Sequence, residues 1–214
     1  GLLKLSGNNT YSGLTTVSAG ELRVSHQGSL GTTGSGTDVK AGAYLTFVGG
    51  VDAARELEIA EPIFLNSDSG GSAAGLGSFS GYTELTSTLT LQGKSEIKSE
   101  ANSDLLLDPA SGYAIAISTS TCTAANSCLL SIVGDGSVQT DAGHGIDLYN
   151  GSSDYSSQKV LTIGDSNGPG KLTIKGASDM QGSVDIQEGV LNVGHQDALG
   201  EINYVYLGSS TTGA

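Results

Sequence analysis

The sequence predicts an all-β protein, a single parallel β-helix over residues 1–214, and three observations support this. Short apolar runs that alternate with period two recur along the chain, which indicates strands with one buried face. Turns rich in Gly and Asn end these runs after about three to five residues, and strands this short are unstable alone. One unit also recurs, because residues 172–200 match residues 3–31 without a gap. Short strands in a recurring unit are typical of a solenoid, in which each coil buries its strands against the next.

The internal repeat aligns apolar and glycine positions alike. Leu3 aligns with Leu172, and Gly20 aligns with Gly189. Glycine supplies positive φ or close backbone approach at corners, so equal glycine spacing predicts equal corners. His26 and His195 are also equivalent, which favours a structural corner role for both. The same alignment pairs Gly7 with Gly176, Gly13 with Gly182, Val17 with Ile186, Leu22 with Leu191, Val24 with Val193 and Leu30 with Leu199.

The chain between the two copies keeps the short strands without the exact repeat. At about 20–25 residues per coil, the whole chain holds about eight to ten coils. Residues 51–61 contain helix-favouring Ala, Glu and Leu, but Leu57 and Ile59 alternate, so we expect a strand at 55–60. Two segments rich in small and polar residues, 66–84 and 118–128, are predicted to protrude from the coils as loops.

Composition and charge exclude several classes of function. The chain has 33 Gly, 3 Phe and no Trp, and 37% of its residues are hydrophobic, which indicates a narrow aliphatic core. The formal net charge is −13, with 22 acidic and 9 basic residues. This balance argues against nucleic acid as a partner, since phosphate binding needs clustered Lys and Arg. No run approaches the roughly 18 apolar residues of a membrane span, so we expect no membrane insertion of this fragment. No signal peptide is visible.

Cys122 and Cys128 enclose five small or polar residues. In an exported protein, this spacing suits a local disulfide worth about 2 kcal/mol through loop closure. The alternative is two free thiols in a turn. The spacing does not match a zinc site. We expect neither a metal nor a cofactor, and we interpret Asp135, Asp141 and Asp147, spaced six residues apart, as solvated turn residues.

Residues Gly164-Asp165-Ser166-Asn167-Gly168 fit the Gly-x-Ser-x-Gly pattern of serine hydrolases. A serine nucleophile needs a histidine base and an orienting carboxylate. His144 with Asp141 or Asp147 would be the set available. However, Ser166 lies in a turn between two strands, whereas the hydrolase elbow needs a following helix. We therefore interpret the segment as an ordinary turn and predict that the chain is not an enzyme.

The two repeat copies resemble the autotransporter-associated β-strand repeat. The first copy carries its motifs as Leu3-Lys4-Leu5-Ser6-Gly7-Asn8-Asn9-Thr10-Tyr11-Ser12-Gly13, Thr15-Thr16-Val17, Gly20-Glu21-Leu22-Arg23-Val24 and Ser29-Leu30-Gly31. The second copy carries Gly189-Val190-Leu191-Asn192-Val193 and Ala198-Leu199-Gly200. It departs from the family pattern at Asp179-Met180-Gln181, where the family has Thr-Tyr.

The resemblance implies a right-handed β-helix in the passenger domain of a bacterial autotransporter. Such passengers are exported across the periplasm and outer membrane by a C-terminal translocator barrel in the parent chain. The family is therefore typical of secreted or surface-displayed proteins, and it carries no catalytic residues. Adhesion and signalling to a host cell are typical roles, so the expected partner is a host cell-surface protein or receptor.

We expect binding residues on loops, because loops carry recognition while the solenoid positions them. The predicted binding segments are 66–84, 118–128 and 149–158. Their candidate residues are Asp68, Tyr82, Asn126, Tyr149 and Tyr155. Two alternatives remain open at this point. One is a structural stalk for a function elsewhere in the parent chain, and the other is a carbohydrate-active β-helix enzyme, which needs paired carboxylates.

Overall fold

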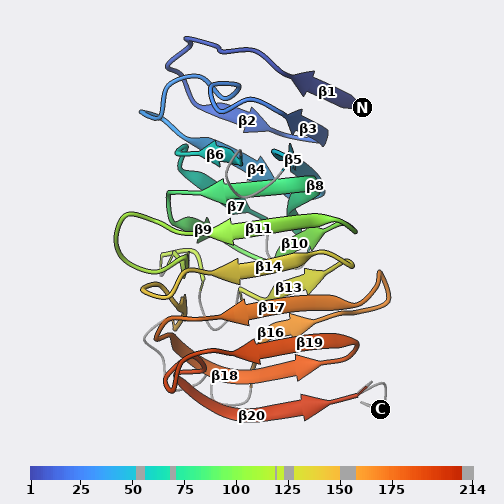
Figure 1. Cartoon of the computed structure of the whole chain (residues 1–214). Coiled ribbons are helices and arrows are strands. Elements are labelled where there is room, and N and C mark those ends of the chain that lie inside the picture. Colours follow the sequence, from blue (N-terminus) through green and yellow to red (C-terminus); the bar gives the residue numbers. More distant parts are fainter. Residues whose placement is uncertain (52–55, 68–70, 119, 123–127, 150–157, 209–214) are drawn as a thin grey trace.

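The computed structural model of the protein describes residues 1–51, 56–67, 71–118, 120–122, 128–149 and 158–208. These residues form strands and turns and contain no helix. The coils stack along one axis, with β1 at one end of the stack and β20 at the other (Figure 1). The named strands pair in parallel from coil to coil. The predicted all-β parallel β-helix is therefore confirmed.

The strands form three faces, which we name sheets A, B and C. Sheet A contains β1 (Leu2–Leu5), β3 (Gly20–Val24), β5 (Ala43–Val48), the first part of β8 (Ala74–Leu85), β10 (Ser95–Ser99), β13 (Leu130–Val133), β16 (Lys159–Ile163), the last part of β18 (Asp179–Ile186) and β20 (Glu201–Leu207). Sheet B contains β2 (Thr15–Val17), β4 (Thr37–Lys40), β7 (Ile63–Asn66), β9 (Leu89–Leu91), β12 (Ile115–Ile117), β15 (Ile146–Leu148) and the start of β18. Sheet C contains β6 (Leu57–Ile59), the end of β8, β11 (Ser103–Leu107), β14 (Ser137–Thr140), β17 (Gly170–Ile174) and β19 (Gly189–Val193).

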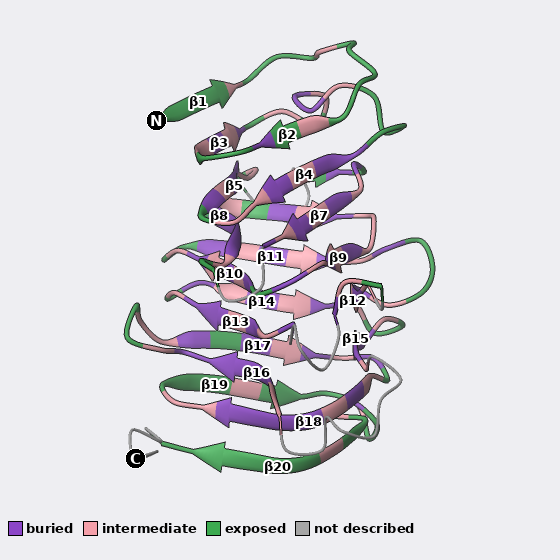
Figure 2. Cartoon of the chain, turned by 180° about the vertical axis from the view of Figure 1, so that it is seen from behind, coloured by how far each residue is buried: buried purple, intermediate pink, exposed green. Residues whose placement is uncertain are grey.

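The core is a stack of aliphatic side chains from alternate strand positions. One row on sheet A runs in register through Leu22, Leu45, Leu76, Ile97 and Ile132. All five are buried, as expected for strands with one face inward. Figure 2 shows burial along the middle of the stack and exposure at β1, β19 and β20, where no further coil covers the strands.

The predicted loop at 66–84 is wrong for its larger part, because residues 74–84 belong to β8. This strand pairs with β5 and β10 in sheet A, then turns the corner and pairs with β6 and β11 in sheet C. Its glycines serve close packing. A Cβ at Gly81, where φ is +72°, would lie 2.1 Å from the carbonyl oxygen of Gly50. The glycines of this segment therefore reflect the close approach of neighbouring atoms to the strand and do not mark a loop. The strand expected at 55–60 is present as β6, and residues 52–55 lie outside the described residues.

The two repeat copies share their corner geometry. Gly20 and Gly189 both have positive φ, as their alignment predicts. A Cβ at Gly20 would lie 2.4 Å from the carbonyl oxygen of Gly1, and a Cβ at Gly189 would lie 2.0 Å from that of Gly170. Both copies therefore need glycine for the same reason, which is the approach of the preceding coil's backbone.

The copies nevertheless occupy different faces of the β-helix. Strand β1 pairs with β3 in sheet A, whereas the equivalent β17 pairs with β19 in sheet C. The corner histidines remain equivalent. The Nδ1 of His26 accepts a hydrogen bond from the amide of Gly28, and the Nδ1 of His195 accepts one from the amide of Asp197, each at 3.0 Å. The structural role predicted for both histidines is confirmed.

Candidate functional site

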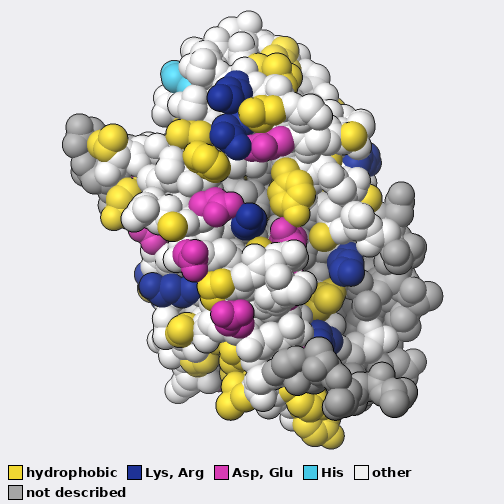
Figure 3. Space-filling model, turned by 90° about the vertical axis from the view of Figure 1, so that its right-hand side faces the viewer, with side chains coloured by type: hydrophobic (Ala, Val, Ile, Leu, Met, Phe, Trp, Pro, Cys, Tyr) yellow, Lys and Arg dark blue, Asp and Glu magenta, His cyan; other side chains and the backbone are white. Residues whose placement is uncertain are grey.

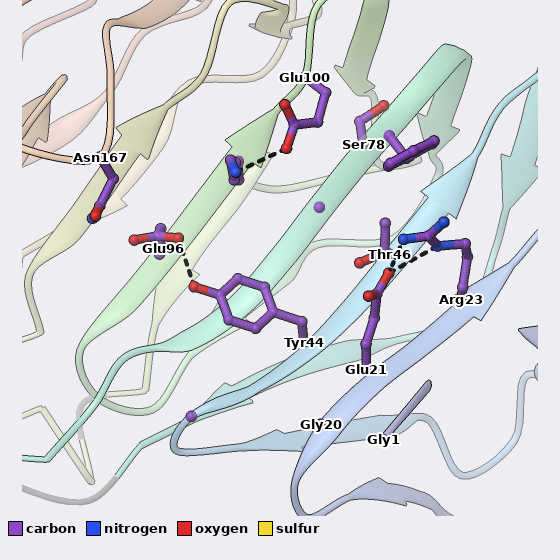
Figure 4. Close-up of a pocket in the computed structure, with 14 residues that line it drawn as sticks. Gly1, Gly20, Glu21, Arg23, Tyr44, Thr46, Ser78, Glu96, Glu100 and Asn167 are labelled. Carbon is purple, nitrogen blue, oxygen red and sulfur yellow. Dashed lines mark hydrogen bonds and ion pairs between the residues drawn. The ribbon is translucent and has the colours of Figure 1, made fainter. Parts of the chain in front are cut away.

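A groove of about 600 Å³ crosses the outer face of sheet A (Figure 4). Two rows of outward-facing positions form its floor, one level per coil. The third level, on β8, carries glycine in both rows, and side chains of the neighbouring level cover these glycines: Tyr44 lies over Gly75 and Thr46 lies beside Gly77, so both glycines are buried. The rows are Glu21, Tyr44, Gly75 and Glu96, and Arg23, Thr46, Gly77 and Lys98.

Tyr44 reaches across the glycine level of β8. Its hydroxyl donates a hydrogen bond to Glu96 Oε1 at 2.7 Å, two levels away. The ring lies over Gly75, where a Cβ would approach the ring atoms to 2.2 Å. Glycine at 75 therefore permits this position of Tyr44. Burial and the contact with Glu96 raise the pKa of Tyr44, so its hydroxyl stays protonated and remains a donor.

Phe79 and Arg23 form another part of the groove wall. The guanidinium carbon of Arg23 lies 4.2 Å from the centroid of the Phe79 ring, a cation–π arrangement. The Nη2 of Arg23 also lies 2.6 Å from Glu21 Oε1. The Phe79 side chain is 45% exposed, which leaves apolar surface for a ligand.

Charges in the groove are paired within the chain. Lys98 Nζ lies 2.8 Å from Glu100 Oε1, and this hydrogen bond raises the pKa of Lys98. Figure 3, seen from the side of β1, β3 and β5, shows acidic and basic side chains interspersed with apolar ones. The groove thus offers an aromatic surface together with hydrogen-bond donors and acceptors, and its electrostatic potential is not dominated by one sign of charge.

The turn between β16 and β17 also lines the groove, through Asn167. The Oδ1 of Asp165 accepts a hydrogen bond from the Asn167 amide at 2.7 Å, and the Asp165 and Gly168 backbones pair with each other. Ser166 lies at the corner between sheets A and C, whereas His144 follows β14 at the corner between sheets C and B. The width of sheet C separates Ser166 from His144, which agrees with the prediction that residues 164–168 form an ordinary turn.

Of the residues predicted for binding, the two that the structure describes lie at different corners of the β-helix. Tyr82 lies on β8, where its amide and carbonyl pair with Gly50 at the corner between sheets A and C. Tyr149 follows β15, at the corner between sheets B and A, and its amide donates to Asp147 Oδ1 at 3.0 Å. Three further residues, Asp68, Asn126 and Tyr155, lie outside the described residues.

Cys122 and Cys128 are joined by a disulfide, with their Cα atoms 5.3 Å apart. Both half-cystines are buried against the core. The Sγ of Cys122 also lies 3.4 Å from the carbonyl oxygen of Leu91 on β9. The disulfide thus closes the connection between β12 and β13 against the adjacent coil.

The groove residues were missed by sequence reasoning. Period-two alternation alone places Tyr44 and Glu96 on outer faces of their strands. Their contact depends on which strand levels are neighbours, and β8 had been predicted as a loop. A signal was present in Gly75 and Gly77, two glycines with strand spacing inside an apolar run, which indicates close approach beside a strand.

Comparison with known families identifies the repeats. A family model described as the passenger-associated-transport-repeat matches residues 1–24 and 167–193, which form β1 to β3 and the region of β17 to β19. No curated protein and no solved structure matches the chain. The predicted resemblance to an autotransporter passenger with repeats is confirmed.

The repeat family implies secretion or display at the cell surface, and it is not an enzyme family. Within the described ranges, no helix is long and apolar enough to cross a bilayer. Five residues that line the groove lie in the two matched segments, namely Gly1, Gly20, Glu21, Arg23 and Asn167. The other lining residues come from β5, β8, β10 and the turns beside them, between those segments.

Proposed function

We propose that this chain is part of an exported passenger that engages a receptor on a host cell through the groove of sheet A. The observation that carries the proposal is the groove of about 600 Å³, which Tyr44 and Phe79 line on either side of Gly77. A stalk does not need a groove of this kind, and most of the residues that line it lie between the two segments that match the repeat family.

The lining chemistry favours the glycan part of a surface glycoprotein. Glu21 is paired with Arg23, and Glu100 is paired with Lys98, so a neutral ligand meets little net charge. Sugar hydroxyls need both donors and acceptors, which these side chains provide. The exposed face of an aromatic ring is negative and attracts the C–H groups of a sugar ring. Concave sites with an apolar wall and a few polar groups are the usual form of ligand sites.

The test fills the groove from its floor. Gly77→Leu adds a side chain above β8, and its Cβ would lie 3.1 Å from Thr46 Oγ1 and 3.3 Å from Thr46 Cγ2, so the Thr46 side chain has to shift by a few tenths of an ångström. Binding of the fluorescently labelled protein to cultured mammalian cells is measured by flow cytometry. We expect saturable binding by the wild type and a loss of at least tenfold in affinity for Gly77→Leu.

Gly34→Leu is the matched control, since nothing lies within 4 Å of a Cβ there, and it should bind as the wild type does. Removing surface glycans with glycosidases should abolish binding, whereas a protein epitope would survive that treatment. Absence of saturable binding by the wild type favours the stalk. Wild-type affinity of a folded Gly77→Leu variant refutes the groove as the receptor site.

A further inference from the structure

A second group of ligating side chains lies away from the groove, at the corner where sheet C passes into sheet B. Asp108 follows β11 and Asp141 follows β14. Because Leu107 is in register with Thr140, the two aspartates occupy the same position in adjacent coils. His144 follows in the short turn after β14. One donor atom from each of the three side chains lies within 4.8 Å of the others.

The distances at His144 are too long for direct pairing. Its Nδ1 lies 3.4 Å from Asp108 Oδ1 and 4.0 Å from Asp141 Oδ2. Charge-assisted hydrogen bonds are about 2.7–2.9 Å long. The Nδ1 atom is closed off from solvent and has no hydrogen-bond partner among the described residues. A buried ring nitrogen that faces two carboxylates without bonding to either therefore needs another partner.

A metal ion satisfies this geometry. Tetrahedral zinc with bonds of about 2.0–2.1 Å places its ligand atoms about 3.3 Å apart. The 3.4 Å between His144 Nδ1 and Asp108 Oδ1 matches this value, and Asp141 Oδ2, 4.0 Å from the same nitrogen, is the one donor atom of the three that would have to move toward an ion. An imidazole with two carboxylate oxygens suits ions of the zinc class, whereas calcium and magnesium prefer oxygen ligands alone.

The backbone holds two of the three groups in place. The amide of Gly143 donates a hydrogen bond to Asp141 Oδ2 at 3.2 Å, which orients this carboxylate. The His144 backbone packs against Gly176 on the next coil, where a Cβ would lie 2.4 Å from the His144 carbonyl carbon. The net charge of −13 also favours a cation over an anion at the protein surface.

We propose that Asp108, Asp141 and His144 bind one divalent transition-metal ion of the zinc class. The ion would link the coil of β11 to the coil of β14 as a clamp between neighbouring levels of the stack. This proposed site revises the sequence-based expectation of no metal site, and it does not depend on the proposed receptor function.

Isothermal titration calorimetry with zinc chloride tests the site on the chelator-treated chain at neutral pH. We expect one ion per chain, with an affinity at least tenfold weaker in each of Asp108→Asn, Asp141→Asn and His144→Gln. Calcium chloride should bind at least tenfold more weakly than zinc. The control is His195→Gln, since His195 is exposed and faces one carboxylate, that of Asp197, at 3.9 Å. Unchanged affinity in folded ligand variants, or equal losses in the control, overturns the proposal.

A measurement on the wild type remains decisive if a variant fails to fold. The chain has 3 His, so the ring nitrogens of all of them are resolvable in long-range ¹H–¹⁵N spectra. Zinc should shift the Nδ1 resonance of His144 and leave His26 and His195 unchanged. A zinc-dependent shift at another histidine, or none at His144, refutes the site.

Discussion

The hydrogen bond between Tyr44 and Glu96 should couple β5 to β10 across the glycine level of β8. Hydrogen bonds to charged groups contribute about 1.5–3 kcal/mol. Tyr44 is half-buried and the 2.7 Å contact is short, so the lower part of that range applies. In a double-mutant cycle of Tyr44→Phe and Glu96→Ala, we expect a coupling free energy of about 1.5 kcal/mol.

Urea unfolding followed by circular dichroism gives the four free energies of the cycle. With an m-value of about 3 kcal/mol/M, the coupling corresponds to about 0.5 M in the midpoint. Tyr11→Phe is the control, because Tyr11 forms an exposed hydrogen bond with Thr15 at 2.9 Å and should cost less than about 0.5 kcal/mol. A coupling indistinguishable from zero would show that Tyr44 does not hold the groove wall through Glu96.

The same bond sets a pH dependence with a definite sign. The pKa of Tyr44 is raised in the folded protein, so the folded state retains the proton more strongly than the unfolded chain does. The contribution is complete below the ordinary tyrosine pKa of about 10 and is lost as the pH rises above it. Wild type and Tyr44→Phe should therefore converge in stability above that pH, and parallel curves would contradict the argument.

Three further predictions concern other parts of the stack. Ile97→Ala removes a fully buried side chain between Leu76 and Ile132, and it should lower the free energy of unfolding by about 3 kcal/mol in urea titrations. Burial and the neighbouring Glu56 raise the pKa of Glu84 to about 7, so the wild type should lose stability as the pH rises from about 4.5 through 7. Glu84→Gln should remove this loss, about 1 kcal/mol after solvent screening, as measured by thermal unfolding at pH 5 and pH 8. Replacing both Cys122 and Cys128 by Ser should cost about 2 kcal/mol in thermal unfolding, and an equal midpoint in wild type and variant would contradict a structural role for the disulfide.

The alternation of apolar residues predicted individual strands well. It failed where glycines lie inside a strand, because glycine occurs both in turns and in closely packed strands. Leu57 and Ile59 alternate, and β6 forms there despite helix-favouring neighbours. Gly75 and Gly77 also lie in a strand, but their segment was predicted as a loop because glycine is equally common in turns. The two cases differ because side chains from another coil cover these glycines: Tyr44 lies over Gly75 and Thr46 lies beside Gly77.

The candidate site was less predictable than the fold. The residues of the groove come from strands separated by tens of positions, and connections of unequal length set which levels are adjacent. The same holds for Asp108 and Asp141, whose common position in adjacent coils is visible only in the register of β11 with β14.

By itself, the sequence determined the local structure of each coil, which consists of short strands with alternating apolar residues and of corners formed by glycine. It also determined the repeat, whose two copies keep the same strand pairing: Leu3 pairs with Leu22, and Leu172 pairs with Leu191. These features are local, since they need only a coil and its neighbour. The tertiary structure alone decided that the first copy lies on sheet A and the second on sheet C, and which outward side chains meet. The level and face at which a strand lies depend on the lengths of all the coils between it and its neighbours, so the sequence of one segment alone does not determine them.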